Sequence, residues 1–356
     1  MKAKINVTKT FLPSQEEYQS ILKRAWDTGW MTNRGVLVKE LELKLKEFLG
    51  VSNIIAMTNG TLPIQIAIKG LGLKGEIITT PFTYVATTAA IVWESCTPVF
   101  VDIHPTYLTI DETKIEAAIT SETSAILATH VYGNPCHVEE IDRIARKYDL
   151  KVIYDAAHCF GVKYKGESIF NYGDVSTCSF HATKLFHTGE GGALFCKSEY
   201  YDQFFQHHNF GHEGPEAFYG LGINAKMSEL QAAMGLVVLP YMSEIMDRRK
   251  RVINLYQECL GGSNIDMFHI RDKAIWNYAY FPVMFESVKK LLEVKQTLEI
   301  NNIYPRRYFF PTMDTLPYLR QSSCYIARDV SRRILCLPLH DKLTESDILR
   351  ITSLIV

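Results

Sequence analysis

Short apolar runs alternate with helical patterns through the first half of this chain, and this alternation restricts the possible folds more than any other feature. The apolar runs lie at residues 53–57, 76–79, 98–101, 125–129 and 152–154, and the helical patterns lie at residues 62–71, 84–93, 113–119 and 137–148. Such alternation predicts a mostly parallel sheet with helices on both faces. Ligands of sheets of this kind bind at the carboxyl ends of the strands.

Helical patterns also flank this region. Residues 14–28 and 37–49 come before it, and Gly50 is a natural end for the second helix. Residues 227–260 come after it, with Pro240 as an expected break. A smaller α+β pattern then follows, with strands at 278–284, near 303 and at 334–336, and helices at 287–299 and 344–354. We therefore predict a large α/β domain over residues 1–245 and a smaller α+β domain over residues 246–356.

The composition excludes several classes of function. The formal net charge of −1 gives no electrostatic footprint for nucleic acid or an anionic membrane. No apolar run approaches the ~20 residues that cross a bilayer, and the N-terminus does not resemble a secretory signal. The eight cysteines show no Cys-x-x-Cys pair and no metal-like spacing, so we expect no metal site, reduced thiols and a cytoplasmic protein.

The segment best suited to chemistry runs from Ser179 to Lys184. It lies between two strand-like runs, residues 175–180 and 192–196, and a glycine-bearing stretch at residues 188–192 follows it. A surface lysine is rarely placed in such a connection. Lys184 is therefore a candidate amine nucleophile, provided that other parts of the chain supply it with a partner.

Three groups at other strand ends are candidates for that partnership. Residues 58–61 follow a strand and open a helix, which suits either an anion site that uses Thr61 or simply a capped helix start. Tyr84 begins the next helix, where it would stack on a flat ligand or pack in the core. Asp155 ends an apolar strand, and its carboxylate requires either an Arg or Lys partner or a protonated heterocyclic nitrogen. Together with Lys184, these groups meet the requirements of pyridoxal 5′-phosphate (PLP).

The chain resembles the DegT/StrS-type family of sugar-nucleotide aminotransferases almost end to end. The motifs that carry the resemblance include Thr58-Asn59-Gly60-Thr61, Pro81-Phe82-Thr83-Tyr84, His130-Val131-Tyr132-Gly133-Asn134-Pro135, Asp155-Ala156-Ala157-His158, Ser179-Phe180-His181-Ala182-Thr183-Lys184, Gly222-Ile223-Asn224-Ala225-Lys226 and Leu337-Pro338-Leu339-His340. This resemblance implies the PLP fold type I, with an aspartate-aminotransferase-like large domain.

The resemblance also implies roles for individual residues. Lys184 would form the Schiff base with PLP, and Asp155 would hold the pyridine nitrogen. The phosphate would be bound by Gly60, Thr61 and Ser179. Tyr84 would cover the ring, and Asn224 would reach the phosphate in the neighbouring subunit of a homodimer.

Two histidines depart from the family pattern. His158 stands where many members have a glutamine that touches the 3′-oxygen of the cofactor. His181 stands where other members have tyrosine or another residue, so it is either a substrate contact or a structural loop histidine. Lys184 itself favours transamination, because a dehydrating branch of the family has histidine at that position.

Residues 306–311 resemble the segment of members that act on dTDP-linked 6-deoxy sugars. Arg306 and Arg307 are therefore candidate contacts for a diphosphate, and Tyr308 and Phe309 are candidates to pack on a sugar or base. Arg248, with its neighbour Arg249, is another candidate for the diphosphate. A surface arginine pair is the simpler alternative for Arg248 and its neighbour.

The function expected from the resemblance is transfer of an amino group from L-glutamate to a nucleotide-linked keto-6-deoxy sugar, with dTDP as the expected nucleotide. The product would serve amino-sugar synthesis for surface polysaccharide, O-antigen or a glycosylated metabolite. Three alternatives stay open: a PLP enzyme of this fold that acts on amino acids, a non-catalytic regulator or scaffold, and a phosphate-binding α/β protein without PLP.

Overall fold

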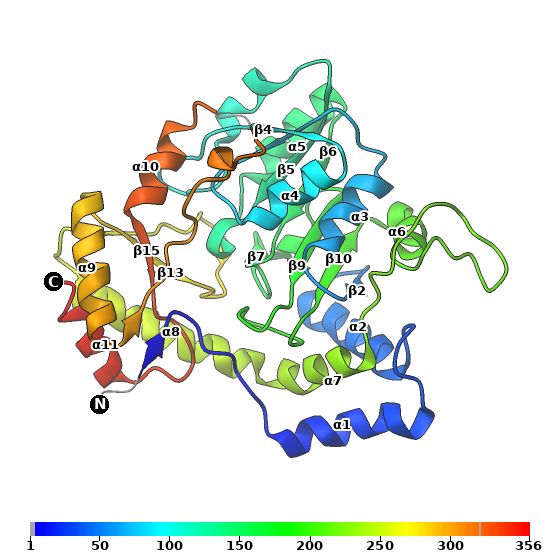
Figure 1. Cartoon of the computed structure of the whole chain (residues 1–356), viewed down its shortest axis with the longest axis horizontal. Coiled ribbons are helices and arrows are strands. Elements are labelled where there is room, and N and C mark those ends of the chain that lie inside the picture. The colour runs from blue at the N-terminus through cyan, green and yellow to red at the C-terminus, as the bar shows by residue number, and fades with distance from the viewer. Residues whose placement is uncertain (1–3, 320–321) are drawn as a thin grey trace.

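A seven-stranded sheet forms the centre of the chain in this computed structural model, which describes residues 4–319 and 322–356 (Figure 1). The strand order is β2-β10-β9-β6-β5-β3-β4, and only β10 runs antiparallel to its neighbours. The strands are β2 (Ile55–Met57), β3 (Glu76–Thr79), β4 (Thr97–Phe100), β5 (Thr123–Thr129), β6 (Lys151–Asp155), β9 (Val175–Ser179) and β10 (Gly192–Cys196). The predicted, mostly parallel sheet is confirmed.

Helices cover both faces of this sheet, because successive strand residues point to opposite sides. Ile126 and Ala128 of β5 belong to one apolar cluster, whereas Ala125 and Leu127 belong to another. The first cluster is closed by α2 (Val36–Leu49), α5 (Val138–Tyr148) and α7 (Glu229–Val238), and the second by α3 (Leu62–Gly70), α4 (Val85–Trp93) and α6 (Tyr201–His207). Helix α1 (Gln15–Thr28) begins at the Ser14 cap and packs against α7. Both predicted N-terminal helices are confirmed.

The long helical pattern breaks at Pro240, as predicted. A 3₁₀ turn, Leu239–Tyr241, separates α7 from α8 (Met242–Leu260). Met242 belongs to the core of the central sheet, whereas Val252 belongs to a separate C-terminal core. Helix α8 therefore connects two cores, and the division of the chain near residue 245 stays a prediction.

The C-terminal core lies around a second, smaller sheet. Its strands are β11 (Asp266–Met267), β13 (Phe281–Met284) and β15 (Ile334–Leu337), and its helices are α9 (Val288–Ile300), α10 (Tyr325–Arg333) and α11 (Glu345–Thr352). Strand β1 (Ile5–Asn6) pairs with β14 (Ile303–Tyr304), so the start of the chain joins this part. Figure 1 shows this part beside the central sheet.

One predicted helix is wrong. Residues 113–119 form two short 3₁₀ turns, Glu112–Lys114 and Glu116–Ala118. Asp111 accepts a hydrogen bond from the N–H of Thr113 and caps the first turn. A seven-residue segment forms too few helical hydrogen bonds to offset the free-energy cost of nucleating an α-helix. Hydrogen bonds between nearby side chains and the backbone therefore stabilise the shorter turns instead. The pattern also missed α6 and α10.

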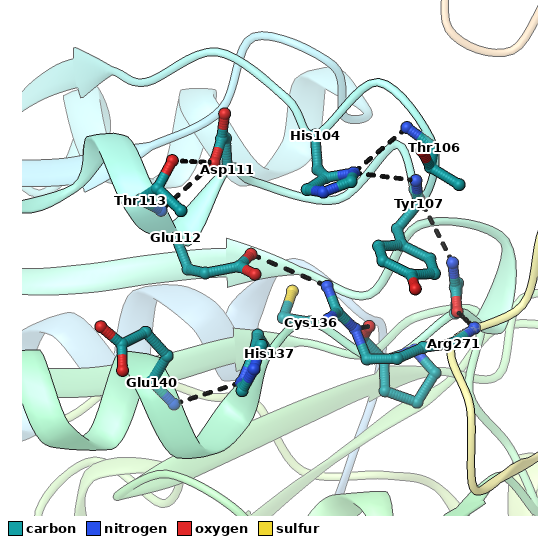
Figure 2. A network of polar contacts seen from close by, with 12 residues as sticks. His104, Thr106, Tyr107, Asp111, Glu112, Thr113, Cys136, His137, Glu140 and Arg271 are labelled. Carbon is teal, nitrogen blue, oxygen red and sulfur yellow. Dashed lines mark hydrogen bonds and ion pairs between the residues drawn. The ribbon is translucent and has the colours of Figure 1, made fainter.

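Arg271 ties the C-terminal part of the chain to the loops of the central sheet (Figure 2). Its guanidinium lies 3.7 Å from the carboxylate of Glu112 and donates to the carbonyl of Pro135, while its backbone N–H donates to Asn134. Both side chains of the ion pair are more than nine-tenths buried. This region therefore holds the segment between β11 and β13 firmly against the large sheet.

No helix within residues 4–319 and 322–356 is long and apolar enough to cross a membrane. The same residues contain no group of three or more His, Cys, Asp or Glu side chains placed to hold a metal ion.

Candidate functional site

A cavity of about 650 Å³ lies where β5, β6 and β9 end. Its lining contains Thr58, Asn59, Gly60, Thr61, Ile64, Thr83, Tyr84, Ala86, Thr129, Asp155, Ala157, His158, Ser179, His181, Thr183, Lys184, Glu190, Tyr280, Arg306, Tyr308 and Phe309. The topology brings these groups together, because parallel strands present their carboxyl ends at one edge of the sheet.

Lys184 reaches the cavity from the connection between β9 and β10. The N–H of Lys184 donates to the carbonyl of His181, and the N–H of Ala182 donates to Gly189, so the loop closes on itself. Burial lowers the pKa of the Lys184 amine, and the negative charge of Asp155 opposes that shift. The amine is therefore more readily deprotonated than an exposed lysine, which a nucleophile requires.

Asp155 ends β6 with its carboxylate buried. One oxygen, Oδ1, accepts from the N–H of Ala157 at 3.1 Å, and the other, Oδ2, accepts from the hydroxyl of Thr87 at 2.6 Å. No arginine or lysine in the described part of the chain forms an ion pair with it. The protein-internal salt bridge that the sequence left open is not formed, so a cationic ligand group remains the expected partner.

Gly60 and Ser179 form a narrow cradle at one end of the cavity. A Cβ on residue 60 would lie 2.6 Å from the Cβ of Ser179, so only glycine fits. Asn59 Oδ1 accepts from the N–H groups of Thr61 and Leu62, so the helix start is capped, as one reading of the sequence proposed. The hydroxyl of Thr61, which lines the cavity, has no partner within the described residues and is free for an anion.

Tyr84 is not a core aromatic. It precedes α4, lines the cavity and is 57% exposed. The nearest described ring is that of Phe309, whose centroid is 6.4 Å away in a tilted arrangement. One face of the tyrosine therefore remains open to a flat ligand.

His158 is held as a neutral ring. Its Nδ1 accepts from the backbone N–H of Tyr132 at 3.1 Å. A backbone N–H can only donate, so the proton of the neutral imidazole lies on Nε2. Burial and the positive charge of Lys184 hold its pKa well below the ordinary histidine value. His158 thus presents a donor, without a charge, beside the cavity.

His181 lies at the rim of the cavity and is partly exposed. Its Nδ1 lies 2.8 Å from the hydroxyl of Thr183, and its Nε2 lies 3.6 Å from Glu190. The structure therefore brings His181 to the cavity, and both of these contacts are to residues of its own loop.

The C-terminal part forms one wall of the cavity, with Tyr280, Arg306, Tyr308 and Phe309. Arg306 pairs through its backbone with Cys336, and its exposed side chain lines the cavity. The predicted Arg307 lies elsewhere, with its guanidinium 3.5 Å from the centroid of the Phe310 ring and a hydrogen bond to a backbone carbonyl. Of the two predicted arginines, Arg306 is therefore the one that lines the cavity, because residues 306 and 308 lie on the same side of an extended segment.

Two further predicted residues are not brought to the cavity. Arg248 forms an ion pair with Glu244 and lines a separate hollow of about 530 Å³ beside residues 11–17. Asn224 is exposed and forms a backbone bridge with Asn209, on the segment between α6 and α7. Neither residue contributes to this site within its own chain.

Comparison with known proteins places this arrangement in a family. Residues 13–356 match the model of the DegT/DnrJ/EryC1/StrS aminotransferase family. The dTDP-4-amino-4,6-dideoxy-D-glucose transaminase of Shigella dysenteriae is 43% identical over 98% of this chain and 97% of its own length. A protein of the same name from Escherichia coli is 39% identical over 99% of this chain and 98% of its own.

A solved structure agrees over the whole chain. The crystal structure of DesI in the presence of its TDP-sugar product superposes with a TM-score of 0.95 at 30% identity, and the match covers 100% of this chain and 93% of that one. The predicted PLP fold type I is therefore confirmed, and the chain belongs to the DegT/DnrJ/EryC1/StrS aminotransferase family of PLP-dependent enzymes.

Proposed function

We propose that this enzyme transfers an amino group from L-glutamate to a dTDP-linked keto-6-deoxy sugar. The observation that carries the proposal is that Lys184 and Asp155 share one cavity with the cradle of Gly60 and Ser179. The names of the Shigella and Escherichia relatives support a dTDP-linked 4-amino-4,6-dideoxy sugar as the aminated partner.

The cavity fits PLP at each of its functional ends. The cradle and the free hydroxyl of Thr61 suit a phosphate. Asp155 has no arginine or lysine partner among the described residues, as expected for a carboxylate that binds a protonated pyridine nitrogen. When bound, PLP supplies an aldehyde that condenses with amines and a ring that accepts electron density from the bond that breaks. A volume of about 650 Å³ leaves space for a sugar beside the cofactor.

We assign Lys184 two tasks. Its amine would hold the cofactor covalently between turnovers. Once released, its Nζ would carry the proton between the substrate carbon and the C4′ carbon of the cofactor, and in the opposite direction in the other half of the reaction. The lowered pKa of Lys184 increases the fraction of free amine at neutral pH, which favours both tasks. Asp155, which lines the cavity, would stabilise positive charge on the ring.

We assign His158 to the 3′-oxygen of the cofactor, as the resemblance implies. Its Nε2–H is a donor that does not depend on protonation of the ring, because the Tyr132 amide occupies Nδ1. A glutamine at this position would offer the same kind of donor through its amide. The departure from the family pattern therefore leaves the hydrogen bond available.

The C-terminal residues that line the cavity, Tyr280, Arg306, Tyr308 and Phe309, are here called the substrate wall. This wall is proposed to recognise the diphosphate through Arg306. This guanidinium lines the cavity beside Tyr308, and its Cζ lies 5.6 Å from the centroid of the Tyr308 ring. This proposal uses Arg306 rather than Arg307, because the Arg307 guanidinium packs on the ring of Phe310. Tyr308 and His181 then lie where a sugar would contact them.

A homodimer is proposed from the segment between α6 and α7. This segment protrudes from the chain in Figure 1 and carries Phe210, Phe218, Tyr219 and Leu221, each about half exposed or more. A run of exposed aromatic and aliphatic side chains marks an interaction surface. In a dimer, Asn224 of the same segment would be available to the cofactor phosphate of the neighbouring subunit.

The proposed setting is the cytoplasm, where the product would enter amino-sugar synthesis for surface polysaccharide. Both statements follow from the resemblance and the reduced cysteines rather than from the site.

The deciding experiment offers the purified enzyme L-glutamate and a panel of dTDP- and UDP-linked 3-keto and 4-keto 6-deoxy sugars. NMR of the products should show one aminated dTDP-sugar. Simple keto acids serve as competing amine acceptors. Amination of keto acids alone would replace the proposal with a PLP enzyme of amino acids, and bound PLP that never reacts with glutamate would replace it with a regulator.

A further inference from the structure

Three buried hydroxyl groups form a chain that ends on Asp155. The Oγ1 atoms of Thr129 and Thr83 are 2.9 Å apart, and those of Thr83 and Thr87 are 2.8 Å apart. Thr87 then donates to Asp155 Oδ2 at 2.6 Å. Thr129 ends β5, Thr83 directly precedes α4 and Thr87 lies in the first turn of that helix. With Asp155 at the end of β6, the hydroxyl chain therefore joins three separate segments.

The direction of this chain follows from counting hydrogens. Each threonine hydroxyl has one proton to donate, and an ionised carboxylate only accepts. Thr87 uses its proton on Asp155, so the proton between Thr87 and Thr83 belongs to Thr83. By the same count, Thr129 donates to Thr83. All three hydroxyls therefore point in one sequence toward the carboxylate.

Burial makes this alignment effective. Thr83 and Thr87 are fully buried and Thr129 is 4% exposed. Hydrogen bonds strengthen one another in a chain and act more strongly where the dielectric constant is low. The chain and the Ala157 amide occupy one lone pair on each oxygen of Asp155. Each oxygen keeps a further lone pair for a ligand, and Asp155 lines the cavity.

We propose that Thr87, supported by Thr83 and Thr129, is a positioning residue for the cofactor ring that acts through Asp155. The hydroxyl chain fixes the rotation of the carboxylate and leaves a free lone pair for the pyridine nitrogen. This inference rests on the proposed function, because it requires Asp155 to be the partner of that nitrogen.

A comparison of Thr87→Val with Thr87→Ser tests the proposal. Valine keeps the shape but removes the hydroxyl, whereas serine keeps it. Two measurements are made on each enzyme: the dissociation constant of 4′-deoxypyridoxine 5′-phosphate, which cannot bond covalently to a lysine, and the ¹⁵N NMR signal of the ring nitrogen in labelled PLP. The valine variant should bind the analogue about tenfold more weakly. This factor corresponds to the lower end of the range of free energies for a hydrogen bond to a charged group.

The ring nitrogen signal should move toward the unprotonated form in Thr87→Val and stay at the wild-type position in Thr87→Ser. Thr88→Val is the matched control, since Thr88 is equally buried in the same helix but its hydroxyl has no partner in the described residues. It should change neither measurement. Thr129→Val should change both in the same direction as Thr87→Val, but less.

A folded Thr87→Val enzyme with wild-type affinity and a wild-type nitrogen signal would overturn the proposal. If that variant fails to fold, Thr129→Val decides, and unchanged readings there would overturn it equally. Asp155→Asn separates this inference from the proposed function. If Asp155→Asn leaves both readings unchanged, the assignment of Asp155 itself is wrong, whereas loss in Asp155→Asn without loss in Thr87→Val rejects the hydroxyl chain alone.

Discussion

Asn277 offers a stringent test of how the C-terminal part supports the cofactor site. Its side chain is 1% exposed and lies in the segment between β12 (Ala274–Ile275) and β13. Its amide donates to the carbonyls of His158 at 2.8 Å and Phe160 at 2.9 Å, and its oxygen accepts from the N–H of Ala279. One side chain therefore satisfies three buried backbone groups and fixes the turn that carries His158.

Asn277→Ala should destabilise the protein by about 3 kcal/mol. The substitution leaves two carbonyl groups and one N–H group without partners, and each buried unsatisfied group costs ~1–3 kcal/mol. Water that enters the vacated space would satisfy some of them, so the lower end of the sum is expected. Asn277→Asp should be at least as damaging, because a carboxylate accepts from Ala279 but cannot donate to either carbonyl.

Urea unfolding followed by circular dichroism measures this loss. The cofactor-free protein is compared at one fixed concentration, because bound PLP and subunit association would otherwise add to the stability. Asn301→Ala is the control, since Asn301 makes one exposed hydrogen bond to its own helix. A loss for Asn277→Ala no larger than for Asn301→Ala would show that the three hydrogen bonds carry no net stability and refute the reasoning.

Three further predictions concern the amine, the buried ion pair and acid stability. Lys184→Ala should abolish turnover and the visible absorbance of covalently bound PLP, and a variant that retained both would exclude the assignment. Arg271→Met should destabilise by ~3–5 kcal/mol in urea, because Glu112 keeps a buried charge without its partner; adding Glu112→Leu should restore much of the loss, and an additive result would argue against the pair. Burial and the charge of Arg271 lower the pKa of His130 to about 3. The His130 ring therefore stays neutral in the folded state, whereas in the unfolded state it binds a proton below pH 6.5. The free energy of unfolding should therefore fall as the pH drops from 6.5 toward 3. His130→Asn should reduce the slope of that free energy against pH by up to ~1.4 kcal/mol per pH unit. An unchanged slope would mean that His130 titrates normally.

The central sheet could be predicted from the sequence because its strands are buried on both sides. Continuous apolar runs such as residues 125–129 are typical of strands buried on both faces, and the helical pattern at residues 137–148 shows a clear polar face. The segment at residues 113–119 shows the opposite case. Its apolar spacing suits a helix, but the Asp111 side chain bonds to the backbone and stabilises tighter turns. A periodic pattern does not detect such local competition.

The cofactor side of the site was predicted for a related reason. Lys184, Asp155 and Ser179 follow strands, and topology alone carries strand ends to one edge. The hydroxyl chain to Asp155 was missed, because threonine is common in strands and at helix starts and its hydrogen bonds depend on the packing of separate segments. Arg248 was predicted from charge alone, and its pairing with Glu244 on the same helix was not considered.

The sequence predicted both arginines of the substrate wall, and the folded chain shows that Arg306, rather than Arg307, lines the cavity. Arg306→Gln should raise the KM for the nucleotide sugar by about 10- to 100-fold, which corresponds to a lost hydrogen bond to a charged group, and should leave the KM for glutamate and the absorbance of bound PLP near wild type. Arg307→Gln is the matched control, because that guanidinium lies against Phe310 outside the cavity. A larger effect of Arg307→Gln would mean that the diphosphate approaches from the other side of this segment. Equal effects on glutamate and sugar would instead mean that Arg306 serves an anion common to both substrates, since the two occupy the same cavity in turn.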